Sequence, residues 1–257
     1  MHRLRSPSAW ISYDRYGKGP PLVLVHGSFS NHASNWELVK RLLEDRFTVY
    51  AVARRGRGET DATDERSVPD EGADVATVLA AIGEPVFLLG HSYGGQVALA
   101  AAARAPERVR KLVVYEPPWP TALDAKVVQR LEAFARAGEW DTLATTFFRD
   151  LLAVPAAELD GVRSSPLWPL IVADARASLG DVRALLRYEF VAERFRTITC
   201  PVLLQIGTES PRHLYVTDAL AGVLPDARIE ELPGQAHEGM TTAPEPYAAA
   251  VARFLLG

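Results

Sequence analysis

A serine between two glycines is the feature of this chain best suited to chemistry. The stretch Gly90-His91-Ser92-Tyr93-Gly94 follows an apolar run at 86–89 and leads into an alanine-rich helical pattern. Because no loop separates the expected strand and helix, Ser92 must adopt a cramped backbone conformation, with small neighbours permitting close approach. The helix start supplies free N–H groups and a partial positive charge that favour an oxyanion. The pattern is typical of a nucleophile elbow and favours acyl transfer.

A serine hydroxyl needs a general base, because the neutral group is a weak nucleophile, and histidine is the side chain that titrates near neutral pH. His237 is the candidate among six histidines. It follows a Pro-Gly turn after the last apolar strand and precedes a helical pattern at 244–256. His91 flanks Ser92, but its side chain should point in a different direction, which favours a packing role.

These motifs and their order resemble the α/β-hydrolase superfamily over nearly the whole chain. The resemblance rests on His26-Gly27, the Ser92 elbow and the run from Pro233 to His237. The stretch Arg54-Arg55-Gly56-Arg57-Gly58 also resembles the R-G-x-G loop of many members. Their usual Asp before it is Ala53 here and their usual Ser after it is Thr60, which we expect to alter loop packing more than chemistry.

The resemblance also implies an oxyanion hole made of two backbone N–H groups. They would come from Tyr93, after the nucleophile, and from Ser28, after His26-Gly27, with Phe29 as a nearby substitute. Each such donor is worth about 10²- to 10³-fold in rate. The Ser28 hydroxyl could add a third donor or cap the loop.

The acid that orients the histidine is not at its usual place. Most resembling proteins carry an Asp three residues after a Gly that ends a late strand, and this chain has Ser210 there, with Glu209 one residue earlier. Glu116 instead follows the strand expected at 112–115, a position that haloalkane dehalogenases and zearalenone lactonases use for the acid. We prefer Glu116 to Glu209, because the carboxyl end of a parallel strand is where open α/β sheets place functional groups.

Size and composition point to a soluble enzyme-sized chain without a nucleic-acid or membrane partner. The chain has 257 residues, 48% of them apolar, with a formal net charge of -4. No segment approaches the roughly 20 apolar residues of a membrane span, so we expect a cytoplasmic protein. Cys200 is the only cysteine and is expected to be buried filler.

Short apolar runs alternate with helical patterns, which predicts an α/β fold with a mostly parallel, doubly wound sheet. The expected strands are 22–26, 47–52, 86–89, 112–115, 202–206 and 228–232, with an antiparallel edge at 10–16 and crossover helices at 35–43, 72–81 and 93–105. This rhythm stops after Pro117-Pro118 and resumes near Cys200. The predicted division is a core of 1–117 and 200–257 and an inserted helical lid, or cap, at 118–199, with helices at 124–137, 140–151, 167–179 and 181–190.

The function expected from these features is hydrolysis of a small apolar ester or lactone through an acyl-enzyme on Ser92, by a monomer or homodimer without metal or cofactor. Phe29, Trp119 and Trp168 are the candidate substrate-binding residues. Two alternatives stay open. The same residues could hydrolyse a carbon–carbon bond in a diketone, or the chain could be a ligand-binding receptor that has lost turnover, because the usual acid is missing. The natural substrate depends on cap packing that a sequence does not specify.

Overall fold

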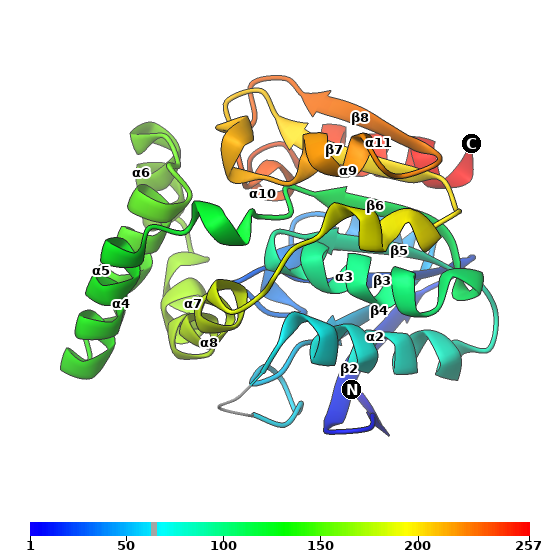
Figure 1. Cartoon of the computed structure of the whole chain (residues 1–257), viewed down its shortest axis with the longest axis horizontal. Coiled ribbons are helices and arrows are strands. Elements are labelled where there is room, and N and C mark those ends of the chain that lie inside the picture. Colours follow the sequence, from blue (N-terminus) through cyan, green and yellow to red (C-terminus); the bar gives the residue numbers. More distant parts are fainter. Residues whose placement is uncertain (63–65) are drawn as a thin grey trace.

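The chain forms one twisted eight-stranded sheet with helices on both faces and a helical cap at one end (Figure 1). The computed structural model describes residues 1–62 and 66–257. The strand order is β1-β2-β4-β3-β5-β6-β7-β8, antiparallel at β1, β2 and β4 and parallel from β4 onward. The strands are β1 His2–Arg5, β2 Trp10–Gly17, β3 Pro21–Val25, β4 Thr48–Ala53, β5 Val86–His91, β6 Val109–Tyr115, β7 Val202–Gly207 and β8 Ala227–Leu232.

Alternate residues of the central strands enter two separate cores, as the two-residue period of a strand requires. Val23 and Leu88 pack under α2 and α3, whereas Leu24 and Leu89 pack under α1 and α11. Both faces are therefore buried, which explains why these strands are apolar throughout. The core helices are α1 Lys40–Glu44, α2 Val68–Ile82, α3 Tyr93–Arg104, α9 Thr217–Ala221, α10 Gly239–Thr242 and α11 Pro244–Leu256.

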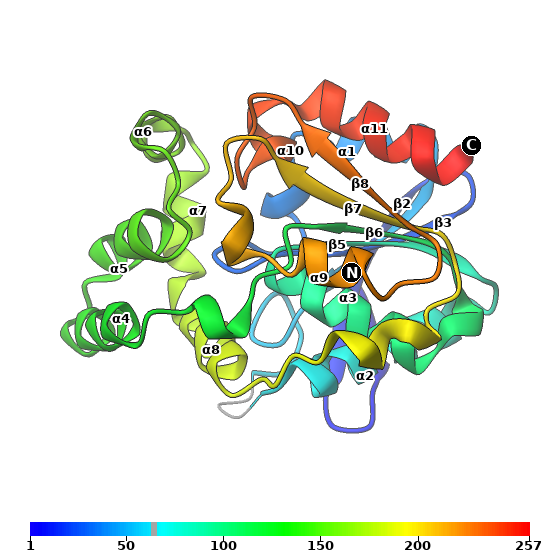
Figure 2. The same cartoon turned by 45° about the horizontal axis from the view of Figure 1, so that its top comes forward.

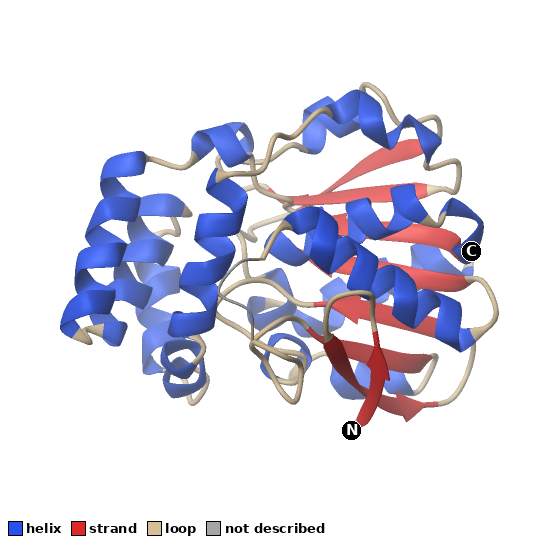
Figure 3. Cartoon of the chain, turned by 60° about the horizontal axis from the view of Figure 1, so that its bottom comes forward, coloured by secondary structure: helices blue, strands red, loops and turns tan. Residues whose placement is uncertain are grey.

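The cap is built only of helices and lies beyond the carboxyl ends of the parallel strands (Figures 2 and 3). Its helices are α4 Ala125–Ala137, α5 Trp140–Thr146, a π-helical turn Phe147–Leu151, α6 Ala156–Ser164, α7 Trp168–Ala173 and α8 Ala175–Leu186. The chain returns to the core after α8, where the 3-10 turn Ala192–Thr197 runs along α3 and buries Phe195 in the core. No helix of the described residues is long and apolar enough to cross a membrane.

The expected strands are all present, and the main errors concern helices. The helix expected at 35–43 is a 3-10 turn, Ser34–Trp36, followed by α1. The edge strand β1 of the sheet and helix α6 of the cap were not expected. The break between the two expected helices at 167–179 and 181–190 lies instead at Asp174. Gly180 is internal to α8, and a Cβ there would lie 2.8 Å from the Arg66 guanidinium. A larger side chain there would have to displace the end of the Arg66 side chain, and the glycine does not terminate the helix.

Candidate active site

Ser92 occupies the sharp turn between β5 and α3. Its backbone has φ 54° and ψ −126°, a conformation that is uncommon for any residue but glycine. Its N–H donates to the carbonyl of Tyr115 at 2.8 Å, which fixes the turn to β6. A Cβ at Gly94 would lie 2.3 Å from the carbonyl oxygen of His26, so a side chain is excluded there. The structure therefore has the nucleophile-elbow geometry predicted from the motif.

Glu116 and His237 form a buried pair at the same edge of the sheet. Glu116 Oε2 lies 2.6 Å from His237 Nδ1, and the two side chains are 0% and 2% exposed. The other oxygen, Oε1, accepts a hydrogen bond from the Gly207 N–H at 2.8 Å. Glu116 also has a positive φ, 48°, so two strained residues, Ser92 and Glu116, end adjacent strands.

Glu209, the alternative acid, does not reach His237. Its side chain is exposed, and its carboxylate accepts a hydrogen bond from the Thr208 hydroxyl at 3.2 Å. Ser210, which stands where most resembling proteins carry the acid, is buried. The carboxylate beside the histidine is thus that of Glu116.

Two residues hold the loop that carries His237: Tyr115, which precedes Glu116, and His91, which precedes Ser92. The Tyr115 hydroxyl donates to the Ala236 carbonyl and accepts from the Gly239 N–H. His91 Nε2 lies 3.0 Å from the His237 carbonyl oxygen, and since a carbonyl only accepts, His91 Nε2 must carry the proton. Burial lowers the pKa of His91 well below 6.5, so it stays neutral. His91 therefore positions the loop, in agreement with its predicted packing role.

Carboxylates surround His237 and favour its charged form. Burial lowers the pKa of His237, but the hydrogen bond and charge of Glu116 outweigh that effect and raise the pKa above 6.5. Glu238 and Glu158 act in the same direction. Burial raises the pKa of Glu238 to about 7. Glu158 lies on cap helix α6, and its charge contributes to the raised pKa of His237.

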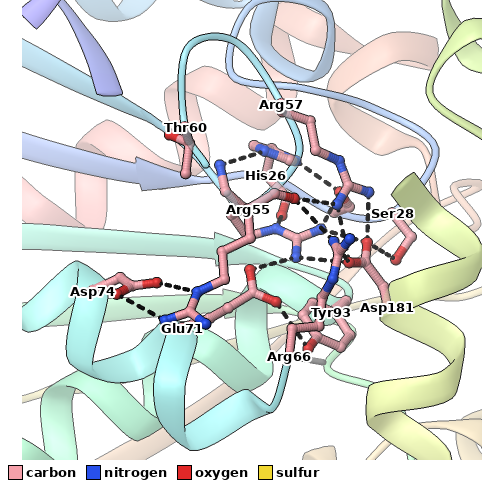
Figure 4. Close-up of polar contacts among 12 residues, drawn as sticks. His26, Ser28, Arg55, Arg57, Thr60, Arg66, Glu71, Asp74, Tyr93 and Asp181 are labelled. Carbon is pink, nitrogen blue, oxygen red and sulfur yellow. Dashed lines mark hydrogen bonds and ion pairs between the residues drawn. The ribbon is translucent and has the colours of Figure 1, made fainter. Parts of the chain in front are cut away.

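The backbone N–H groups of Ser28 and Tyr93 have no partner among residues 1–62 and 66–257, whereas the N–H of Phe29 donates to Ser178 Oγ at 2.6 Å. Phe29 is thus unavailable as the substitute donor. The Ser28 hydroxyl donates to Asp181 at 2.9 Å, so its proton is already used to secure the loop (Figure 4). Of the two roles left open for this hydroxyl, the loop-capping role matches the structure.

The arginine-rich loop after β4 lies next to Ser28 and Tyr93 (Figure 4). The Thr60 hydroxyl donates to the Ala53 carbonyl at 2.7 Å and accepts from the Ser12 N–H at 2.8 Å. Ala53 and Thr60, the two residues that differ from the usual R-G-x-G pattern, are therefore hydrogen-bonded to each other. His26 Nε2 accepts the Arg54 N–H at 3.1 Å, and burial lowers the pKa of His26 well below 6.5. His26 is thus a neutral structural residue.

A cavity of about 30 Å³ lies between Ser92 and the two candidate oxyanion donors, Ser28 and Tyr93. It is lined by Ser28, Ser92, Tyr93, Pro118, Leu123, Phe147, Leu151, Leu152, Asp181, Val182 and Leu185. Neither predicted tryptophan is among them. The Trp168 indole N–H donates to Asp141 at 2.6 Å within the cap, and Trp119 packs edge-on against Phe190, with ring centroids 5.1 Å apart. Phe29 stacks near Phe147, at 4.2 Å between ring centroids, and borders a second cavity of about 30 Å³.

A family model described as the alpha/beta hydrolase family matches residues 22–250. The chain belongs to this family. The crystal structure of an alpha/beta hydrolase from Sphaerobacter thermophilus is similar, with a TM-score of 0.83 and 31% identity over 99% of this chain and 100% of that chain. The enol-lactonase from Burkholderia xenovorans shares the fold, with a TM-score of 0.83, 19% identity and full coverage of both chains.

Among curated relatives, the chain is 29% identical over 262 residues to 2-(acetamidomethylene)succinate hydrolase from Mesorhizobium japonicum, covering 93% of this chain and 89% of that protein. It is 27% identical over 245 residues to a putative carbamate hydrolase from Caulobacter sp., with coverage of 91% and 90%. These relatives support hydrolase activity for this member of the family, and their different substrates leave its specificity to the site itself.

A cation could be considered only at one place in this hydrolase. Among the described residues, His91, His237 and Glu238 offer ligand atoms within 4.8 Å of one another. However, His91 Nε2 is committed to the His237 carbonyl, and His237 Nδ1 to Glu116. These ring nitrogens therefore already have partners within the protein. That the protein needs no metal stays a prediction.

Several residues around the site were not found from the sequence. Tyr215 stacks on His237, with ring centroids 5.6 Å apart and an interplanar angle of 12°. Asp181 and Ser178 on cap helix α8 bind Ser28 and Phe29, and Glu158 on α6 adds a negative charge near His237. No local motif marks these residues. The only available signal was the arginine-rich loop, whose charges required a buried acidic partner.

Proposed function

We propose that this protein is a serine hydrolase that cleaves a carboxylic ester or lactone through an acyl-enzyme on Ser92. The observation that carries the proposal is the 2.6 Å contact between Glu116 and His237, at the same edge of the sheet as the strained elbow of Ser92. Nucleophile, acid and base each follow a different strand, in the chain order Ser92, Glu116, His237, at one edge of the sheet.

Acylation begins when the substrate carbonyl enters the cavity at Ser92. Because His237 Nδ1 donates to Glu116, its Nε2 carries the lone pair and accepts the Ser92 proton as the oxygen attacks. The N–H groups of Ser28 and Tyr93 bind the oxyanion that forms. The imidazolium, stabilised by Glu116, then protonates the alkoxide leaving group, and the acyl-enzyme remains.

Deacylation repeats these steps with water as the nucleophile. His237 removes a proton from water, the resulting hydroxide attacks the acyl carbonyl, and Ser92 leaves with the proton returned from His237. In a lactone the leaving alkoxide stays attached to the acyl group, so the product is a hydroxy acid. The same site thus serves open esters and rings.

The cavity favours a small apolar acyl group. Six of its lining residues are apolar cap side chains: Leu123, Phe147, Leu151, Leu152, Val182 and Leu185. Its volume of about 30 Å³, measured with a water-sized sphere, has room for only about two or three water molecules, so only a few heavy atoms fit while the cap keeps this position. Short esters are therefore the appropriate first substrates.

Pre-steady-state kinetics with p-nitrophenyl acetate and a small aryl lactone test the proposal. We expect a burst of about one equivalent of p-nitrophenol per chain if deacylation is slower than acylation, followed by steady turnover. A fluorophosphonate should label Ser92 with the same stoichiometry, located by peptide mass spectrometry. Ser92→Ala protein is the control for background hydrolysis and labelling.

Other outcomes separate the alternative functions. Turnover of a dicarbonyl compound, with no turnover of simple esters, would replace ester hydrolysis by carbon–carbon bond hydrolysis. Saturable binding of small esters without labelling of Ser92 would identify a receptor. Labelling of a residue other than Ser92 would overturn the assignment of the nucleophile.

The pH dependence should report His237. The base must be neutral to accept the Ser92 proton, and its pKa is raised, so we expect kcat/KM to fall as the pH falls, with the midpoint above pH 6.5. The charges facing His237 come from Glu116, Glu238 and Glu158, while His91 is neutral and Tyr215 stacks on the ring. Glu158→Gln removes one of these charges and should move the midpoint to lower pH. An unchanged or higher midpoint in that variant would contradict the electrostatic assignment.

A further inference from the structure

Cap helix α8 contacts the loop that carries one predicted oxyanion donor at two successive residues. The Ser28 hydroxyl donates to Asp181 Oδ2 at 2.9 Å, and the Phe29 N–H donates to Ser178 Oγ at 2.6 Å. Ser178 and Asp181 are three residues apart in a helix, so they share one face. Phe29 has a φ of 55°, which shows that the loop adopts a strained conformation where α8 grips it.

Asp181 is the acidic centre of a cluster of three arginines (Figure 4). Its two oxygens accept from Arg54 Nη2 at 2.7 Å, Arg57 Nη2 at 2.6 Å and Arg66 Nη1 at 3.1 Å. The Asp181 side chain is 0% exposed. Burial raises the pKa of Asp181, but Arg54 and Arg57 outweigh that effect and hold its pKa well below the usual range. Asp181 is therefore a permanent anion that orders the surrounding donors.

Arg54 connects Asp181 to the peptide bond between Gly27 and Ser28. While Nη2 and Nη1 of Arg54 bind Asp181, Nη2 also donates to the Gly27 carbonyl at 2.9 Å and Nε donates to the His26 carbonyl at 2.8 Å. The Gly27 carbonyl and the Ser28 N–H belong to the same planar, trans peptide, so they point in opposite directions. A guanidinium that fixes the carbonyl on one side therefore aims the N–H at the other.

The Ser28 N–H has no partner in the described part of the chain, and Ser28 lines the cavity together with Ser92 and Tyr93. Asp181 lines the same cavity from the cap. The contacts thus run from cap helix α8, through Asp181, to both the side chain and the preceding carbonyl of Ser28.

We infer that Asp181 is a positioning residue: together with Ser178 and Arg54 it holds the Gly27–Ser28 peptide so that the Ser28 N–H faces the substrate carbonyl oxygen. The inference rests on the proposed acyl-enzyme function. It gives the cap a role beyond covering the substrate, because half of the oxyanion hole is aligned only while α8 is seated on the core.

Two variants remove the tethers without removing the backbone donor, Ser28→Ala and Ser178→Ala. For each we expect kcat to fall by about 10- to 100-fold, less than or similar to the loss of a whole oxyanion donor, with KM within about threefold of wild type. A trifluoromethyl ketone forms a tetrahedral oxyanion on a catalytic serine, so its inhibition constant should rise by the same factor as kcat/KM falls. Titration with a fluorophosphonate corrects each rate for the fraction of active protein.

Asn31→Ala is the matched control. Its side-chain NH₂ donates to Asp174 at 2.8 Å, which is another hydrogen bond between this loop and the cap, and its Oδ1 accepts from the Ala33 and Ser34 N–H groups, but the side chain does not touch Ser28 or Asp181. We expect its kcat and its trifluoromethyl ketone affinity to stay within about threefold of wild type, because none of these bonds holds the Gly27–Ser28 peptide.

The outcomes distinguish this inference from the proposed function. If wild type neither turns over esters nor labels at Ser92, the function itself fails. If wild type is active but both serine variants keep wild-type kcat and inhibitor affinity, the positioning role is wrong. A loss of kcat without a matching loss of inhibitor affinity, or an equal loss in Asn31→Ala, would likewise overturn it in favour of a general structural role.

Discussion

Glu116→Gln should lower kcat by about 10³- to 10⁴-fold while the protein stays folded. The amide is nearly isosteric, and its oxygen can still accept from the Gly207 N–H. It cannot stabilise an imidazolium, and if its NH₂ faces Nδ1 it imposes the tautomer of His237 that lacks a lone pair on Nε2. The measurement is kcat with a short ester, corrected by active-site titration, alongside circular dichroism to establish folding.

Glu209→Gln is the matched control for this prediction. Its carboxylate is exposed and contacts only its neighbour Thr208 among the described residues. We expect kcat to stay within about twofold, as for most surface substitutions away from special features. A large loss in Glu209→Gln together with near-normal activity in Glu116→Gln would reverse the assignment of the acid.

Asp181→Ala should lower the free energy of unfolding by about 3–5 kcal/mol. The substitution removes the only carboxylate shared by Arg54, Arg57 and Arg66 in the described structure and leaves these buried cations with Glu71, which contacts Arg54 at 3.0 Å. An uncompensated buried charge is far more costly than the ion pair is stabilising. Urea unfolding followed by both tryptophan fluorescence and circular dichroism measures the change and checks that the two transitions coincide.

Asp218→Ala provides the comparison for that measurement. Asp218 also pairs with an arginine, Arg212, at 2.5 Å, but the two side chains are 59% and 40% exposed. Solvent screens such a pair, so the expected loss is only about 0–1 kcal/mol. An equal loss in the free energy of unfolding for Asp181→Ala and Asp218→Ala would show that the buried Asp181 ion pairs stabilise the protein no more than an exposed pair does.

The cluster of Asp181 with its three arginines also explains why the cap is linked to the loop that carries Ser28. Asp181 lies on α8, whereas its partners Arg54 and Arg57 follow β4, about 125 residues earlier in the chain. When the cap packs on the core, Asp181 is placed among the arginines. If the cap were displaced, these arginines would lose Asp181 and keep fewer carboxylate partners in the core. Substrate entry must proceed without disrupting these contacts if the Ser28 peptide is to stay aligned.

The sequence by itself determined the sheet and the places in it of the proposed nucleophile, Ser92, and the proposed base, His237. Strands buried on both faces are continuously apolar, and the glycines around Ser92 are required by local clashes, so both leave a signal within a few residues. The acid was narrowed to Glu116 or Glu209, because both follow strands that end at the same edge. Only the fold separated them, by turning Glu116 inward with a φ of 48° and leaving Glu209 exposed.

Tertiary structure alone decided the contribution of the cap. Trp119 and Trp168 were expected at the substrate pocket from their places in the chain, but a helix can present a side chain to any of several neighbours, and both tryptophans have other partners. Asp181 carries no motif, since its significance arises from three arginines distant in sequence. Steric requirements and hydrophobic periodicity depend on residues close together in the sequence, so a short stretch reveals them. The pairing of buried charges between cap and core depends instead on how elements far apart in the sequence pack together.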